Sequence, residues 1–252
     1  MTKRLVILTI IITLFMGLMH GTSFAAGDFG NINLNINTNE GGPEKTVDTV
    51  KLLILLTVLS LAPSILILTT CFTRIVVVLS FLRNALGTQQ TPPNQLLIGL
   101  ALFLTFFIMQ PVYTQVMDEA VKPFLEEEIS QEEAMDKAII PMKKFMLKET
   151  REKDLALFLR AAGRDNVSDP MELNMTTVIP AYAISELKTA FSIGFIIYIP
   201  FLVIDMVVSS ILMSMGMFML PPVMISLPFK LLLFVLVDGW YLVVESLLKS
   251  FT

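Results

Sequence analysis

The chain has 252 residues, of which 54% are apolar and only 16% are charged, and its mean hydropathy is +0.74. This composition lies far outside that of soluble globular domains and indicates a protein that lies in or against a lipid bilayer. The net charge of -4 is small and the sequence carries no basic patch, so we expect no nucleic-acid binding.

The residue inventory also argues against catalysis. The chain has one histidine, His20, and one cysteine, Cys71, so zinc sites, Ser-His or Cys-His nucleophile pairs and intrachain disulfides lack their residues. No glycine-rich phosphate loop is present either. We therefore expect no enzyme activity, no metal and no cofactor. One alternative class stays open, an intramembrane aspartyl protease using Asp205 and Asp238, although membrane aspartates more often pair with a base.

The first residues predict a cleavable signal peptide over residues 1–25. Lys3 and Arg4 form a positive n-region, an apolar stretch follows, and Ser23-Phe24-Ala25 places small residues where signal peptidase reads them. An uncleaved first membrane helix is the alternative. Residues 26–48 are rich in Asn and Gly, and we expect a polar tether on the periplasmic side.

Residues 49–112 are predicted to form a first hydrophobic hairpin. Its first apolar block, 52–72, is long enough to span a bilayer, whereas the second, 96–109, is short for a span. Arg74 and Arg83 lie in the connection between the two blocks, and the positive-inside rule assigns that connection to the cytoplasm.

Most ionisable residues lie in 113–183, which we predict to be a small helical insert in the periplasm. Ser130-Gln-Glu-Glu133 matches a capping box ahead of an amphipathic helix. The apolar surface that this helix and the next one offer, including Phe145 and Phe158, is too small for an independent core. We interpret Phe145 and Phe158 as an oligomer contact, with packing on the chain's own membrane helices as the alternative.

Residues 184–252 are predicted to form a second hydrophobic hairpin from blocks 191–204 and 223–237, both shortened by prolines or charges. A charge at the bilayer centre costs about 2.5–3.5 kcal/mol on insertion scales. We therefore predict charge pairing between helices or subunits among four residues: Glu186, Lys188, Asp205 and Lys230. Lys230 is expected to pair with Asp205 or Glu186. For Glu186 and Lys188 there is an alternative, which is that the two residues lie at the boundary between membrane and water.

No charged residue lies between Asp205 and Lys230, yet Pro221, Pro222 and Pro228 argue against one continuous helix there. Within this run methionines alternate, at Met213, Met215, Met217 and Met219. Because unbranched thioether side chains repack easily, a broken methionine-lined loop in a membrane protein predicts a soft closure around a passage. Filling of a hydrophobic core is the alternative interpretation.

Three stretches carry a resemblance to a known family: LAPSILILTTCFTRIVVVLS at 61–80, PAYAISELKTAF at 180–191 with IGF at 193–195, and PFLVID at 200–205 with the methionine loop after it. They closely resemble the FliP family of flagellar type III export-gate proteins, over nearly all of the chain after the signal peptide. Ser192 departs from the longer polar residue expected at that position.

The resemblance implies an all-α fold whose helical hairpins form a membrane-associated ring subunit of the flagellar basal body. It implies a homo-pentamer that joins FliQ and FliR, with FlhB and FlhA docked on it, in the bacterial inner membrane and partly raised toward the periplasm. Unfolded flagellar proteins would be exported through the channel, and Met213, Met215, Met217 and Met219 would form its gasket. A secondary transporter for a small solute is the remaining alternative, but the sequence shows no inverted repeat.

Overall fold

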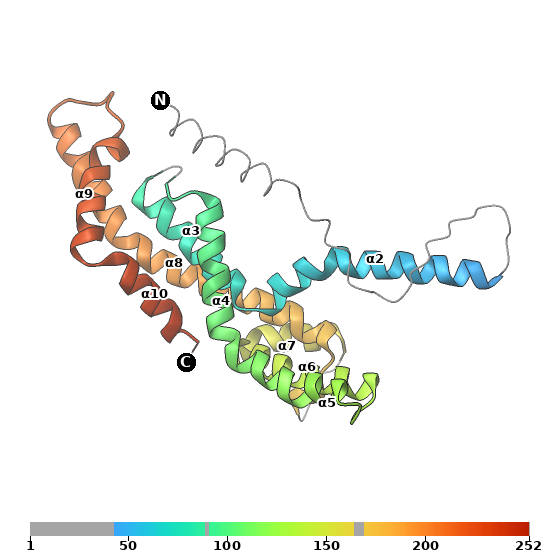
Figure 1. Ribbon diagram of the computed structural model, residues 1–252. Coiled ribbons are helices and arrows are strands. Elements are labelled where there is room, and N and C mark those ends of the chain that lie inside the picture. The colour runs from blue at the N-terminus through green and yellow to red at the C-terminus, as the bar shows by residue number, and fades with distance from the viewer. Residues whose placement is uncertain (1–42, 89–90, 164–168, 252) are drawn as a thin grey trace, which may run out of the picture. The chain divides into compact units, whose positions relative to one another are not determined.

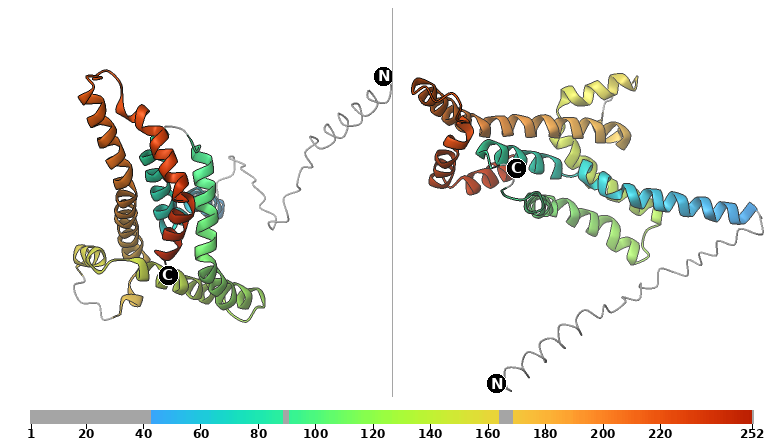
Figure 2. Two further views of the ribbon diagram at one scale, coloured as in Figure 1. Left: turned by 90° about the vertical axis from the view of Figure 1, so that its left-hand side faces the viewer. Right: turned by 90° about the horizontal axis from the view of Figure 1, so that it is seen from above.

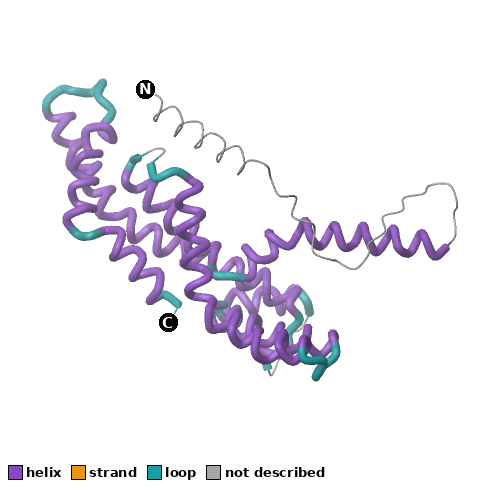
Figure 3. Tube along the Cα trace, in the orientation of Figure 1, coloured by secondary structure: helices purple, strands orange, loops and turns teal. Residues whose placement is uncertain are grey.

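The computed structural model describes residues 43–88, 91–163 and 169–251. Within these residues every regular element is a helix, which confirms the all-α prediction (Figures 1 and 3). The predicted signal peptide and most of the predicted tether lie outside the described residues. The chain divides into two units, Met1–Ile54 and Leu55–Thr252, and the packing described below lies in the second unit.

The elements follow one another in a simple order. They are α2 (Pro43–Thr69), α3 (Phe72–Leu86), α4 (Asn94–Val116), the π-helical turn η1 (Met117–Val121), α5 (Lys122–Leu125), α6 (Gln131–Glu149), α7 (Glu152–Ala161), the 3-10 turn η2 (Pro170–Glu172), α8 (Met175–Ser214), α9 (Pro222–Leu236) and α10 (Gly239–Lys249).

Among the described residues, three helices are long and apolar enough to cross a membrane, and the bent pair α9 and α10, which meet at 63°, is a fourth candidate span. The protein is therefore a membrane protein. One candidate corrects the sequence analysis: the second apolar block was expected to be short for a span, but α4 continues through η1 and α5 as a 32-residue segment, Asn94–Leu125. The π-helical turn at Met117–Val121 joins α4 to α5 within this segment.

Prolines interrupt this fold less than the sequence analysis predicted. Pro228 was expected to break the second hairpin, but α9 runs through it. Membrane helices tolerate proline because neighbouring groups and local adjustments satisfy the freed carbonyls. The break predicted at Pro221 and Pro222 is confirmed, since Pro222 begins α9, where its missing N–H matters least.

Helix α3 forms the centre of the core and packs against both α4 and α8. Its fully buried positions Ile75, Val78, Leu79 and Leu82 recur at helical spacing and make one apolar stripe. Beside this stripe, Phe81 of α3 meets Gly194 of α8, where an added Cβ would lie 2.6 Å from Cγ of Phe81. The two helices therefore approach as closely as they do because this position has no side chain.

Substituting Gly194 by Ala is expected to lower the free energy of unfolding by about 1–3 kcal/mol, because the new methyl overpacks a filled contact. Phe81 cannot simply turn away, since its ring also packs edge-on against Phe191 at 5.1 Å. Thermal unfolding in detergent measures the change. Gly99→Ala is the control, because a Cβ there meets nothing within 4 Å, and equal destabilisation by the two variants would refute the close-contact argument.

The boundary predicted between the insert, 113–183, and the second hairpin lies within a helix. Helix α8 is 40 residues long and continues through the predicted boundary at 183 and 184. At 1.5 Å per residue it extends about 60 Å, roughly twice a hydrocarbon core of about 30 Å. Its N-terminal part packs with α6 and α7 around Met146, Val178 and Tyr182, while its C-terminal part pairs with α9. One continuous helix, with Pro180 and Pro200 inside it, thus joins the insert to the second hairpin.

Candidate functional site: a methionine loop above two buried ion-pair clusters

The methionine loop connects α8 to α9 at one end of the second hairpin (Figures 1 and 2). Helix α8 ends in a Schellman motif, in which Met217 N–H donates to Leu212 C=O at 3.0 Å and Gly216 N–H to Met213 C=O at 3.1 Å. Gly216 has φ +76°, a left-handed backbone conformation that residues other than glycine rarely adopt. The left-handed Gly216 and these two hydrogen bonds therefore end α8, and an open loop follows.

The four predicted gasket residues do not fill the core of this chain. Their exposed fractions are 60% for Met213, 62% for Met215, 42% for Met217 and 97% for Met219. The ring of Phe218 between them is also 78% exposed. Apolar side chains gathered at this exposure at the end of α8 and in the loop after it form a surface suited to contact with lipid or with another protein chain.

Below the loop, an ion pair links α8 and α9. Lys230 Nζ lies 2.6 Å from Asp205 Oδ2, and Ser226 donates its hydroxyl to Asp205 Oδ1. The Lys230 side chain is 2% exposed and Ser226 is fully buried. Of the two partners expected for Lys230, the structure selects Asp205. Gly87, in the turn after α3, lies next to the Lys230 ammonium group. A Cβ added at Gly87 would be 3.8 Å from Lys230 Nζ.

A second buried cluster centres on Arg74, a residue that the sequence analysis placed in a cytoplasmic connection. Arg74 lies instead within α3, 2% exposed. Its Nε donates to Glu186 Oε2 at 3.0 Å, and its Nη2 donates both to Glu186 Oε1 and to Glu149 Oε2, the latter at 2.8 Å. Nη1 donates to Ser250 C=O at 2.9 Å. The guanidinium therefore joins α3, α6, α8 and the segment after α10.

Electrostatics keeps this guanidinium charged. Burial alone would lower the pKa of Arg74, but the carboxylates of Glu186 and Glu149 raise that pKa above its usual value. The ring of Phe251 adds a cation–π contact, with its centroid 3.8 Å from Arg74 Cζ. Each nitrogen of the buried Arg74 guanidinium thus has a hydrogen-bond partner, and these bonds offset the cost of burying the charge.

The remaining predicted residues lie apart from these two clusters. Lys188 is exposed and, two positions after Glu186, points to another side of α8. Phe145 packs within the chain: its ring centroid lies 6.1 Å from that of Tyr182 and 6.5 Å from that of Phe251. Phe158 lies partly buried on α7.

Asp205 and Asp238 do not face each other as a carboxylate pair. Both oxygens of Asp205 are held, by Ser226 and Lys230. Asp238 lies eight residues beyond Lys230, about 12 Å further along the helix direction, exposed in the left-handed turn between α9 and α10. Among the described residues no cluster of His, Cys, Asp or Glu is arranged to hold a metal ion.

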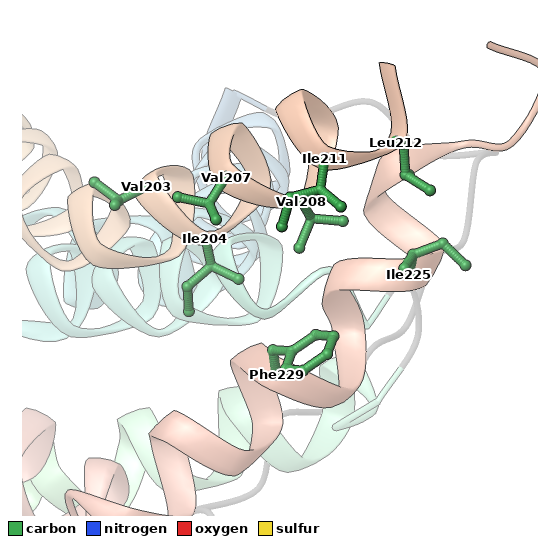
Figure 4. A pocket seen from close by; sticks show the side chains of 8 residues that line it. All are labelled: Val203, Ile204, Val207, Val208, Ile211, Leu212, Ile225 and Phe229. Carbon is green, nitrogen blue, oxygen red and sulfur yellow. The ribbon is translucent and has the colours of Figure 1, made fainter. Parts of the chain in front are cut away.

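The hairpin also carries an open apolar groove of about 440 Å³ between α8 and α9 (Figure 4). Val203, Val207 and Ile211 line it from α8, and Ile225 and Phe229 line it from α9. The wall is apolar throughout, so the groove suits an apolar occupant such as a packed helix or an acyl chain.

These features define the class of protein: an all-helical membrane protein whose second hairpin is tied by buried ion pairs and ends in an exposed apolar loop. Residues 55–247 match the family model described as FliP family. The chain therefore belongs to the FliP family, as its sequence motifs predicted, and has a role in flagellar biosynthesis.

Individual relatives agree with this assignment. The flagellar biosynthetic protein FliP of Bacillus subtilis (strain 168) is 66% identical over 209 residues, which cover 83% of this chain and 95% of that protein. The protein of the same name from Aquifex aeolicus (strain VF5) is 56% identical, over 83% of this chain and 89% of its own length. That of Caulobacter vibrioides is 49% identical over 99% of this chain and 91% of its own length.

Proposed function

We propose that the protein is a channel-forming core subunit of the flagellar type III export gate, through which unfolded flagellar proteins cross the bacterial inner membrane. It acts by assembly and gating, without catalysis and without a cofactor. The observation that carries this proposal is the methionine loop, because a braced hairpin presents four exposed thioether side chains at its end. Flexible, unbranched side chains of this kind can close on one another at rest and repack around a passing chain.

The hairpin below the loop is suited to hold that closure in place. Met213 lies eight residues after Asp205 on α8, so the ion pair with Lys230 fixes the two helices about 12 Å below the loop. A rigid base and a soft tip together let the seal yield while the frame stays assembled. The backbone N–H groups of Gly216 and Met217 are bonded to carbonyls of α8. The methionine side chains can therefore move apart when the seal opens without breaking the end of the helix.

The exposed apolar surface supports assembly with other chains. In the most apolar window of α2, Leu52–Thr69, only 6% of the residues are buried, and the groove between α8 and α9 is open. We propose that copies of this chain form a ring, a pentamer by family resemblance, with Phe158 and the uncovered part of Phe145 contributing to the contact between inserts. FliQ, FliR, FlhB and FlhA would complete the gate in the basal body.

Replacing Met213, Met215, Met217 and Met219 together by Ala is expected to open the resting gate to small ions, because the shorter side chains cannot meet across the passage. Ion permeability of cells that express the assembled gate measures the effect. A matched variant carries Ala at exposed methionines elsewhere, Met117, Met135 and Met206, and should stay tight. An unchanged permeability barrier in the fourfold variant would remove the gasket from the proposal.

A further inference from the structure

A second groove, distinct from the methionine loop, lies between α4 and α6 and encloses about 260 Å³. Pro111 and Val112 from α4 and Phe145 from α6 make its apolar floor. Lys144 and Lys148 line it as well, from positions one helical turn apart on α6. This volume is below that of pockets that enclose a whole small molecule, so the groove fits one part of a larger amphiphile.

Among the described residues, neither Lys144 nor Lys148 has a carboxylate partner. Lys122, Lys137 and Lys249 each form an ion pair with the acid four residues earlier on their helix. The positions four residues before Lys144 and Lys148 hold Ile140 and Lys144 instead.

In the described part of the chain neither Lys144 nor Lys148 takes part in an ion pair, and Lys148 Nζ donates only to the neutral C=O of Phe251, at 3.0 Å. Two positive charges therefore border one apolar groove. An anion seated between them would relieve their mutual repulsion and gain an ammonium partner on each side.

The groove also connects to a surface suited to hydrocarbon. Phe103, Phe107, Pro111 and Gln115 follow one another at four-residue spacing on α4, and the first two are 78% and 65% exposed. They belong to the candidate membrane span Asn94–Leu125. The stripe runs from lipid-compatible aromatic rings at one end to the lysine-bordered groove at the other, as a lipid changes from acyl chain to headgroup.

We propose that this groove binds the headgroup of an anionic phospholipid, with the phosphodiester between Lys144 and Lys148 and one acyl chain along Phe103 and Phe107. The charges favour this occupant over an apolar helix of a second copy. Such a helix would cover two ammonium groups without neutralising them, and unpaired buried charges are strongly unfavourable. The Gln115 amide lines the same groove and supplies a further donor for headgroup oxygens.

The test titrates the purified full-length protein in neutral detergent with phosphatidylglycerol, phosphatidylcholine or glycerol phosphate, and counts bound lipid by native mass spectrometry. We expect phosphatidylglycerol to bind and to raise the unfolding temperature, with neither effect from the other two probes. Each lysine near an anionic lipid contributes enough attraction that Lys144→Gln should weaken binding about fivefold. Lys144→Gln with Lys148→Gln should weaken it more than about tenfold.

The single variant guards against a folding artefact, since it leaves the Lys148 bond to Phe251 in place. The matched control is Lys137→Gln with Lys153→Gln, which removes the same charge from exposed positions and should bind phosphatidylglycerol like the unaltered protein. Equal binding of phosphatidylglycerol and phosphatidylcholine would overturn the proposal, as would glycerol phosphate binding as tightly as the lipid. So would a lipid-free ring that dissociates in Lys144→Gln, because a second copy would then occupy the groove. Failure of the methionine variant to leak would leave this result unaffected.

Discussion

Arg74→Met is expected to lower the free energy of unfolding by about 3–5 kcal/mol, because the substitution leaves Glu186 buried without its partner. Glu186 is fully buried and Glu149 is 10% exposed, so water cannot replace the guanidinium. The loss would separate four parts of the fold at once, since Arg74 also holds the Ser250 backbone. We expect little folded protein to accumulate in the membrane.

Thermal unfolding in detergent and resistance to protease measure this loss. Arg160→Met serves as the control, because Arg160 is exposed on α7 and bonds only to its own helix. Arg74→Met combined with Glu186→Leu should recover part of the stability, since an apolar pair of similar volume can replace a buried ion pair. A single variant as stable as the unaltered protein would show that the cluster is not needed for the fold.

Reversing the charge of Lys230 is expected to prevent the second hairpin from closing. Lys230→Glu would place two carboxylates near 2.6 Å, where like charges in a buried site cannot both stay ionised. Because α8 and α9 meet through this pair, we expect the altered chain to be excluded from any assembled gate. Adding Asp205→Lys restores opposite charges and should restore part of the assembly.

Lys188→Glu is the matched control for this reversal, since it makes the same change on the exposed side of α8. Assembly is measured by co-purification of tagged and untagged copies after solubilisation in detergent. Normal assembly of Lys230→Glu would contradict a structural role for the pair, and a control as defective as the variant would show that general charge balance decides the outcome.

The sequence was sufficient to predict that Lys230 needs a partner, because an ammonium with apolar residues on both sides is costly in a membrane. It could not choose between Asp205 and Glu186, since both lie on α8 and only the approach of α9 decides between them. Arg74 was misplaced for a related reason. Its main partner Glu186 is 112 residues away and Glu149 is 75 residues away, so no local pattern reveals the cluster.

Local rules also predicted more breaks than the fold contains. Pro228 weakens a helix in isolation, but α9 packs against α8 and its backbone stays helical. The change from charged to apolar composition near residue 183 likewise suggested a boundary within what is one helix. A hydropathy pattern describes what surrounds a helix and does not show where the helix ends.

The methionine alternation is the opposite case, in which the local pattern was informative but its structural cause was hidden. A period of two suggests neither a regular helix nor, in this chain, a strand. The structure explains it by the left-handed Gly216, which ends α8 and turns the following methionines into the open loop. A glycine after a long apolar helix was the available signal for that helix end.

If these hairpins gather around a passage that the methionine loops close, an image of the purified full-length protein in detergent, at a resolution that traces helices, should show it. We expect a closed ring with an axial hole, in which the segment from Met213 to Met219 of every copy faces the axis. Single chains separated by detergent or lipid, or a ring whose methionine loops point outward, would contradict it.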